Sequence, residues 1–328
     1  MSMTTIVTGG AGFIGSHLCE ALLARGAQVV CIDSLLTGDI RNLDSFIDDP
    51  RLRFVEADIG EGLPEGLPAP EVIFNLACPA SPKDFERLSL EILDVCSRGM
   101  VNVLELAREH GATLVQASTS EVYGEPEVHP QTEDYWGCVS SVGDRSCYDE
   151  GKRYAEALVM AYRRRHGVDG RLARIFNTYG PRMRLDDGRV VPNFVCQALG
   201  GEPLTIYGDG SQTRSFCYVA DTVAGLLALA DADPDAIDAA CPAYNIGNGA
   251  EITVLEFAQC VLGACGTSGE LQRVPLPQSD DPTRRRPDTS KLSALTGWRC
   301  RTDLATGLAL TTEWFAARLA DSGTGTAR

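Results

Sequence analysis

Hydrophobic and polar residues follow one another along the first half of this chain in the periods of strands and helices. Residues 5–8 form a short buried strand pattern, and apolar positions then recur at helical spacing from residue 14 to residue 22. A second strand pattern ends at Asp33. The pattern predicts a strand, a glycine-rich turn, a helix and a second strand at the start of the chain.

Strand and helix patterns continue to alternate as far as residue 178, after which the elements shorten. Further strands are expected at 51–57, 72–76, 113–117 and 171–176, and long helices at 90–110 and 146–166. This alternation predicts an α/β protein with a Rossmann-like, doubly wound parallel sheet and a smaller α/β substrate-binding lobe. We expect the first lobe to cover 1–178, with 216–247 returning to it, and the second to cover 179–328 with a disordered tail at 321–328.

Composition and charge narrow the possible functions. The chain has 328 residues, 44% of them apolar, and a net charge of −16, which opposes broad binding to nucleic acid or to an anionic membrane. Its twelve cysteines form no CxxC pair, and there are only four histidines, so we expect reduced thiols and no metal site. The sequence shows no signal or transmembrane pattern, and we expect a cytoplasmic protein.

The glycine turn is the first candidate binding site. Gly9, Gly12 and Gly15 let the backbone approach a pyrophosphate, and the helix that opens near Phe13 directs free amides toward it. Asp33 can accept hydrogen bonds from ribose hydroxyls, which favours NAD over NADP. A glycine motif alone is common in tight turns, but here strand, spacing, helix and acid agree. The residues expected around NAD are Gly9, Gly12, Phe13, Ile14, Gly15, Asp33, Thr37, Gly38, Asp58, Ile59, Leu76, Ala77, Ser118, Tyr148 and Lys152.

Tyr148 and Lys152 form the candidate catalytic pair. Four residues apart on the predicted helix 146–166, they lie on one face, and the ammonium group, together with an oxidised nicotinamide, would lower the pKa of the phenol. Tyr148 could then remove a hydroxyl proton, with Ser118 or Thr119 holding the same hydroxyl group. A YxxxK pair alone could equally be an ordinary helix contact, but the dinucleotide pattern favours the catalytic interpretation.

Several segments together resemble one enzyme family. TGGAGFIG, STSEVYG, YDEGKR and RIFNTYGPRM are similar to the extended short-chain dehydrogenase/reductases that act on nucleotide sugars. More narrowly, NLACPASP, CYDEGKRYAE, DGRVVPNF and DDPTRRRPD resemble the UDP-glucuronate decarboxylase (UDP-xylose synthase) family. The resemblance implies bound NAD that is recycled, a UDP-sugar substrate, and a homodimer formed through the helices at 90–110 and 146–166.

The resemblance also implies roles for individual residues. Tyr148 would be the base and Lys152 its partner, Thr119 and Glu121 the polar pair beside the sugar, and Arg285 the arginine that faces the sugar carboxylate. The residues expected to hold the rest of the substrate are Asn177, Arg189, Asn193, Tyr207 and Arg214. A solvated surface is the alternative for the arginine run at 284–286.

The chemistry of such a reaction needs no metal. Oxidation at sugar C4 places a ketone β to the C6 carboxylate, so carbon dioxide can leave and the ketone oxygen can carry the resulting charge. Ser120 stands where related 4,6-dehydratases carry an aspartate, and a serine is a poor acid for expelling a hydroxyl group. Decarboxylation is therefore favoured over dehydration, unless Ser120 serves only in packing.

Two other functions remain as alternatives. A nucleotide-sugar 4-epimerase acting on UDP-glucuronate or UDP-glucose would share the hydride step, and a non-catalytic NAD sensor would share only the cofactor site. The segment 83–98 departs from the family pattern, with Asp94 in place of an expected basic residue. The sequence therefore leaves the exact sugar and nucleotide open.

Overall fold

A seven-stranded parallel sheet forms the centre of the protein. The computed structural model describes residues 3–275 and 284–321. In the sheet the strand order is β11-β6-β5-β4-β1-β2-β3, and every pair is parallel. The bounds are β1 Thr4–Thr8, β2 Gln28–Asp33, β3 Leu52–Glu56, β4 Val72–Asn75, β5 Thr113–Thr119, β6 Gly170–Ile175 and β11 Ala243–Ile246. The predicted doubly wound α/β fold is confirmed.

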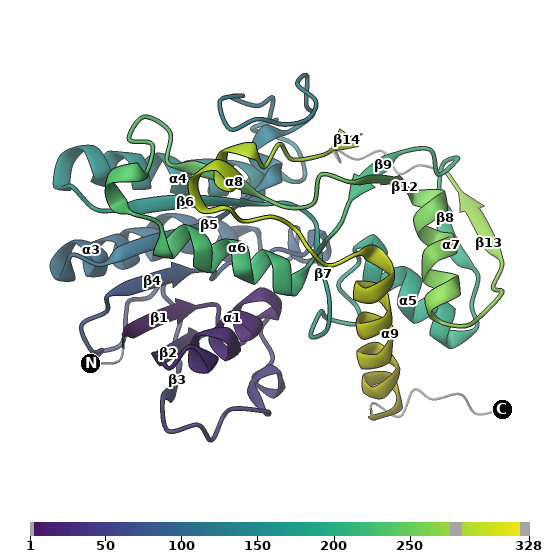
Figure 1. Cartoon of the computed structure of the whole chain (residues 1–328), viewed down its shortest axis with the longest axis horizontal. Coiled ribbons are helices and arrows are strands. Elements are labelled where there is room, and N and C mark those ends of the chain that lie inside the picture. Colours follow the sequence, from purple (N-terminus) through teal and green to yellow (C-terminus); the bar gives the residue numbers. More distant parts are fainter. Residues whose placement is uncertain (1–2, 276–283, 322–328) are drawn as a thin grey trace.

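Helices cover both faces of this sheet (Figure 1). On one face lie α1 (Phe13–Ala24) and α6 (Val219–Asp231); on the other lie α3 (Met100–His110) and α4 (Ser146–His166). The predicted helix 146–166 matches α4 at both ends. Short 3-10 helices connect the larger elements: η1 Ile40–Leu43, η2 Pro82–Asp84, η4 Ser120–Tyr123 and η5 Pro234–Ala236.

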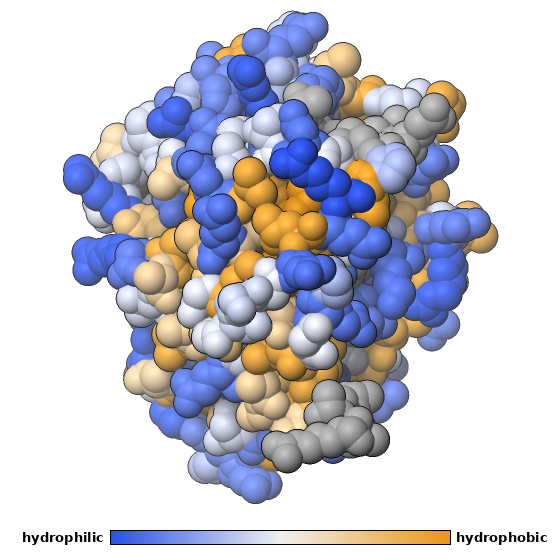
Figure 2. Space-filling model, turned by 90° about the vertical axis from the view of Figure 1, so that its right-hand side faces the viewer, coloured by the Kyte–Doolittle hydropathy of each residue, from blue (hydrophilic) through white to orange (hydrophobic). Residues whose placement is uncertain are grey.

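A smaller group of helices and strands lies beside the sheet, at the right of Figure 1. Its elements are β7 Thr178–Tyr179, α5 Val190–Gly200, β8 Leu204–Tyr207, β9 Thr213–Ser215, β10 Cys217–Tyr218, β12 Glu251–Thr253, α7 Val254–Ala264, β13 Leu271–Val274, β14 Arg284–Arg285 and α9 Leu304–Asp321. Phe194, Phe257 and Phe315 join α5, α7 and α9 in a separate core. Seen from this end (Figure 2), apolar side chains gather toward the middle of the face and polar ones predominate around its edge.

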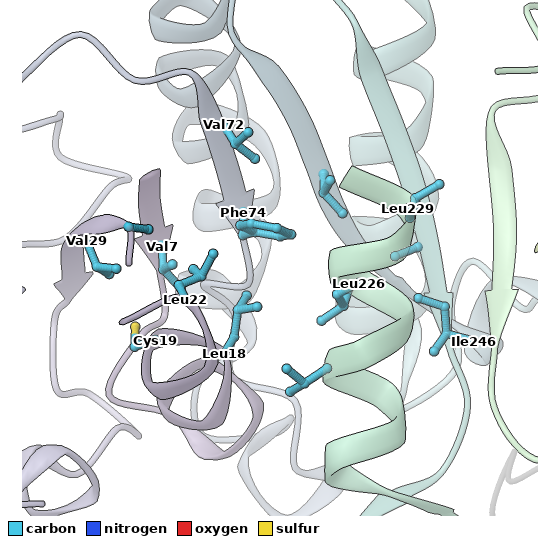
Figure 3. Packing of buried hydrophobic residues seen from close by; sticks show 14 of the residues in the cluster. Val7, Leu18, Cys19, Leu22, Val29, Val72, Phe74, Leu226, Leu229 and Ile246 are labelled. Atoms are coloured by element: carbon cyan, nitrogen blue, oxygen red, sulfur yellow. The ribbon is translucent and has the colours of Figure 1, made fainter. Parts of the chain in front are cut away.

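Residues 219–246 bring the chain back to the large sheet. Helix α6 packs beside α1, and β11 extends the sheet next to β6, while α8 (Ser290–Thr296) packs against α6 and β11. Figure 3 shows Leu226 and Leu229 of α6 on the same side of the sheet as Leu18 and Leu22 of α1. One helix and one strand of this stretch therefore lie against the large sheet. The predicted tail at 321–328 lies outside the described residues, apart from Asp321 at the end of α9.

The long helix expected at 90–110 is not regular. It consists of α2 (Ser89–Asp94), a π-helical segment at Val95–Gly99, and α3. At Gly99, an added Cβ would lie 2.9 Å from the side chain of Ile59, so the segment passes close to the loop after β3. The wider π turn adjusts the helix path at this contact, which hydrophobic periodicity alone did not indicate.

Candidate active site

One large cavity lies at the carboxyl ends of the sheet strands and extends to the smaller group of elements. Its volume is about 1310 Å³. Every residue predicted above for NAD, for catalysis or for the substrate lines this cavity, including Asn193, Tyr207 and Arg214 from the smaller group. The topology therefore brings together residues that lie as far apart in the chain as Gly9 and Arg285.

The glycine turn forms a close backbone cradle. Gly9 has a φ of 68°, in the left-handed region that favours glycine. At Gly15, an added Cβ would lie 2.1 Å from the carbonyl oxygen of Gly9, so no side chain fits there. The cradle meets the first turn of α1 at Phe13, where backbone amides point outward. These features suit the pyrophosphate of NAD.

Asp33 is fixed at the end of β2. Its two carboxylate oxygens accept hydrogen bonds from the backbone amides of Ala11 (3.0 Å) and Leu35 (2.9 Å). An added Cβ on Gly38 would lie 2.6 Å from Oδ1, so the following loop closes tightly over the carboxylate. Burial raises the pKa of Asp33, whereas these amide bonds act to lower it. The carboxylate is thus held in a fixed position at the cavity wall.

The adenosine side of the cavity carries a contact with the last helix. Asp39, in the loop after β2, pairs with Arg41 at 2.7 Å and with Arg318 of α9 at 3.2 Å. Asp58 accepts a hydrogen bond of 2.7 Å from the amide of Gly60 through one carboxylate oxygen. The predicted cofactor wall therefore includes α9, which the sequence did not indicate.

Tyr148 and Lys152 lie buried on the face of α4 that borders the cavity. The ring of Tyr148 stacks on Phe85 with centroids 4.9 Å apart, and Lys152 Nζ lies 5.8 Å from the Tyr148 ring centroid. Lys152 also donates a 3.0 Å hydrogen bond to the carbonyl of Ala117. Burial raises the pKa of Tyr148, while the charge of Lys152 and a hydrogen bond with Thr119 lower it. Lys152 thus acts in the predicted direction, but burial outweighs it in the chain alone.

The hydroxyl group of Ser118 has a partner within the protein. Its Oγ donates a 2.5 Å hydrogen bond to Glu156 of α4, and Glu156 also pairs with Arg174 at 2.8 Å. Although Ser118 lines the cavity, its hydroxyl group thus donates to a partly buried ion pair. Of the two candidates, Thr119 is the one that contacts Tyr148.

Glu121 is the centre of a charged cluster on the wall beside the tyrosine. Its Oε2 pairs with Arg285 at 2.7 Å and with Arg145, and its Oε1 accepts a 3.2 Å hydrogen bond from Ser120. Glu121 is 6% exposed, so the cluster is screened from water. Ser120 therefore contacts the glutamate rather than serving only in packing. Arg145 was missed by the sequence analysis, although its place three residues before Tyr148 was a usable signal.

The unusual segment 83–98 supplies part of the cavity wall. Besides Phe85, it contributes the buried carboxylate of Asp84, which pairs with Arg184 at 2.5 Å and with Arg87 at 3.0 Å. Asp94 pairs with Arg98 within the same segment. Asp94, the acidic residue that departs from the family pattern, is therefore paired within the segment itself, whereas Asp84 is also paired with an arginine outside it.

Arg189, directly before α5, connects the loop that leads into this helix with the loop after β4. Its guanidinium donates a 2.5 Å hydrogen bond to the carbonyl of Ala80, and Ser81 donates one of 2.5 Å to the carbonyl of Asp187. Arg189 therefore has a structural contact as well as a place on the cavity wall.

These features define an NAD-dependent enzyme of the extended short-chain dehydrogenase/reductase type, and the comparisons with known proteins agree. A sequence model of the NAD dependent epimerase/dehydratase family matches residues 5–247, so the chain belongs to that family.

The relatives within the family are more specific. UDP-glucuronic acid decarboxylase 6 of Arabidopsis thaliana is 46% identical over 319 residues, which cover 97% of this chain and 90% of the relative. UDP-glucuronic acid decarboxylase 1 of Danio rerio is 46% identical over 314 residues, covering 96% and 73% of the two chains. The resemblance read from the sequence motifs is confirmed, as is NAD as the cofactor.

Solved structures show the same fold at lower identity. The UDP-glucuronic acid 4-epimerase of Bacillus cereus, in complex with UDP-glucuronic acid and NAD, is 27% identical with a TM-score of 0.84, covering 97% of this chain and all (100%) of the other. The UDP-glucose 4-epimerase of Thermotoga maritima, with UDP-glucose, is 28% identical with a TM-score of 0.85 and covers 97% and 100%. Within residues 3–275 and 284–321, no helix is both long and apolar enough to cross a bilayer.

Proposed function

We propose that this protein converts UDP-glucuronate to UDP-xylose and carbon dioxide. The observation that carries the proposal is the cluster of Glu121 with Arg285 and Arg145, in the same cavity as Tyr148 and Lys152. The 46% identity to UDP-glucuronic acid decarboxylases over 97% of the chain supports the same reaction. In this proposal NAD is regenerated in each turnover.

In this proposal the one cavity binds both molecules. The glycine cradle and Asp33 would hold the pyrophosphate and adenosine ribose of NAD, while Asn177, Arg189, Asn193, Tyr207 and Arg214 would hold the nucleotide diphosphate of the substrate. When bound, NAD supplies a hydride acceptor at sugar C4 and returns the hydride at the end. The arginines provide local positive charge in a protein of net charge −16, which a dianionic diphosphate requires.

Tyr148 would move the proton at C4. Its phenolate form accepts the hydroxyl proton, and the Lys152 ammonium stabilises that form because it lies at the edge of the same buried site. Thr119, which contacts Tyr148, would orient the sugar hydroxyl group. After carbon dioxide has left, the protonated phenol can donate to the oxygen that carries the negative charge.

The charged cluster around Glu121 would bind the C6 carboxylate of the sugar. Arg285 can turn from Glu121 to the C6 carboxylate of the sugar, and Arg145 would keep Glu121 in position during that exchange. Loss of carbon dioxide needs no proton donor at C6, which is consistent with Ser120 at this wall. A proton returned to C5 completes the sugar product.

The direct test is a product analysis. Purified protein with NAD is incubated with UDP-glucuronate, and the nucleotide sugars and released carbon dioxide are measured. UDP-xylose with an equal amount of carbon dioxide supports the proposal. A product of unchanged mass would indicate the 4-epimerase instead, and unaltered substrate in NAD-loaded protein would reject both. A cellular role that survives Tyr148→Phe would favour the NAD sensor.

Three further predictions belong to this proposal. We propose a division into an NAD-binding lobe over 1–178, joined by 216–247, and a substrate-binding lobe over the rest. We also propose a homodimer, formed through the helical stretch at 90–110 and through α4 at 146–166, and a cytoplasmic location. Sedimentation equilibrium of the purified protein tests the dimer, and a monomer at micromolar concentration would contradict it.

A further inference from the structure

Two thiols lie close together beneath the catalytic pair. The Sγ atoms of Cys78 and Cys96 are 3.8 Å apart. Cys78 follows β4 directly behind Leu76 and Ala77 and lines the cavity, whereas Cys96 is buried in the π-helical segment. The pair thus joins the cofactor wall to the irregular helix turn that the sequence analysis did not foresee.

The same two thiols lie next to α4. Cys96 Sγ would be 3.3 Å from a Cβ added to Gly151, the residue before Lys152. The Lys152 charge acts on both sulfur atoms, and Cys147 and Tyr148 are the other titratable groups that face Cys78. A change in the charge or bonding of these two sulfur atoms would therefore alter the electrostatic surroundings of Lys152.

We propose that Cys78 and Cys96 form a reversible disulfide when a peroxide enters the NAD-free cavity, and that this disulfide switches the enzyme off. Cys78 is the residue that a small oxidant can reach through the cavity, while buried Cys96 is positioned to resolve the product. This reading makes the pair a modification site on the back wall of the active site.

The chemistry balances in two steps. The Cys78 thiolate attacks one oxygen of hydrogen peroxide, the O–O bond breaks, and water leaves after one proton is taken up, which gives a sulfenic acid. Cys96 then attacks the Cys78 sulfur, the S–O bond breaks and a second water leaves, so two thiols lose two electrons to one peroxide.

The electrostatic surroundings suit Cys78 as the attacking group. The hydrogen bond from Cys96 and the charge of Lys152 lower the pKa of Cys78 to about 7, against the effect of burial. The pKa of Cys96 is raised by its hydrogen bond to Cys78 and by burial. Since the thiolate is the nucleophile, the oxidation rate should rise with pH and level off above about 7.

Closing the disulfide would move the cofactor wall. The sulfur atoms must approach from 3.8 Å to the bonded distance of about 2.0 Å. Cys78 lies two residues from Ala80, whose carbonyl holds Arg189, and directly after Ala77 on the cavity wall. We therefore expect weaker NAD binding and lower activity in the oxidised protein.

The test treats NAD-free and NAD-loaded full-length protein with hydrogen peroxide, followed by disulfide mapping by mass spectrometry, NAD-binding titration and activity assay. We expect a Cys78–Cys96 disulfide, at least a tenfold weaker affinity for NAD, at least a tenfold loss of activity, recovery with dithiothreitol, and slower oxidation when NAD is bound. The activity readout rests on the proposed decarboxylation, whereas the disulfide and NAD readouts do not, so the two failures can be told apart.

Two variants sharpen the test. Cys96→Ser should leave Cys78 without its partner, so that the reversible loss of NAD affinity disappears.

Cys300→Ser is the matched control. The Sγ atoms of Cys217 and Cys300 are also close, at 3.9 Å, but these residues are remote in sequence from the Cys78 loop and do not line the cavity. This variant should respond to peroxide as the unaltered protein does. Mapping of Cys78 to Cys147, no disulfide at all, or a Cys78–Cys96 disulfide with unchanged NAD affinity would overturn the proposal.

Discussion

The side of the cavity proposed to bind NAD, called the cofactor side, and the side proposed to bind the sugar, called the sugar side, are held by different kinds of interaction. On the cofactor side, backbone atoms do most of the positioning: Gly15 packs on the carbonyl of Gly9, and Asp33 is held by the amides of Ala11 and Leu35. All of these residues come from one continuous stretch of chain. Their geometry therefore depends on local structure and on the sheet beneath it.

On the sugar side, charged side chains from separate segments hold one another. Arg145 and Arg285 reach Glu121 across sequence separations of 24 and 164 residues. Asp84 and Arg184 form a similar pair across 100 residues. Removing one partner of such a buried pair leaves the other charge uncompensated, so this side should respond sharply to single substitutions. The difference suggests that NAD binding and sugar chemistry can be altered independently.

The largest expected effect is a loss of turnover with unchanged NAD binding. Tyr148→Phe should lower kcat by about 10²- to 10⁴-fold, because the group that moves the proton is gone. NAD affinity, measured by fluorescence titration, should change little. Tyr154→Phe, on the exposed face of the same helix, is the control and should keep full activity. Substantial turnover by Tyr148→Phe would refute its assignment as the base.

The next prediction concerns the charged cluster. Arg285→Ala should lower kcat/KM for UDP-glucuronate by roughly 30-fold or more, because loss of one partner of a buried ion pair costs about 2 kcal/mol or more. NAD affinity should again be unchanged, which steady-state kinetics and titration together can establish. Arg286→Ala serves for comparison since its side chain is 41% exposed and lies 3.7 Å from Glu251. Equal losses in the two variants would argue against a special role for Arg285.

A third prediction uses the pH dependence of turnover. Lys152 lowers the pKa of Tyr148 against the effect of burial, so Lys152→Met should raise that pKa. Because the deprotonated tyrosine is the proposed base, the rise of kcat with pH should move upward by about one pH unit or more. A pH profile of kcat measures this directly. A midpoint that stays in place would mean that another group controls the ionisation.

The smallest expected effect lies on the cofactor side. Asp33→Asn should weaken NAD binding by roughly tenfold, because a hydrogen bond to a charged group contributes about 1.5 kcal/mol or more. The preference for NAD over NADP should fall as the carboxylate charge is lost. At saturating NAD, kcat for the sugar should be nearly unchanged. Asp48→Asn, at an exposed position outside the cavity lining, is the matched control; an equal effect there would remove the special role of Asp33.

The same contrast, between local structure and contacts of distant segments, explains which features could be predicted from the sequence. The pattern of the first half predicted α4 at its observed ends and β6 to within one residue, because periodicity and glycine placement are local signals. It did not predict that Ser118 bonds Glu156, or that Phe85 stacks on Tyr148, since both contacts join distant segments through the tertiary fold. Arg145 could have been noticed from its place three residues before Tyr148, but its pairing with Glu121 is visible only after η4 and α4 are placed together.

The position of β11 at the edge of the sheet has a consequence for how the chain can fold during synthesis. Its partner β6 is complete at Ile175, but β11 begins only at Ala243. Until the ribosome has released that later strand, β6 presents an unpaired border that can join other chains. A fragment ending at residue 178 should therefore aggregate more readily than one that continues through residue 247.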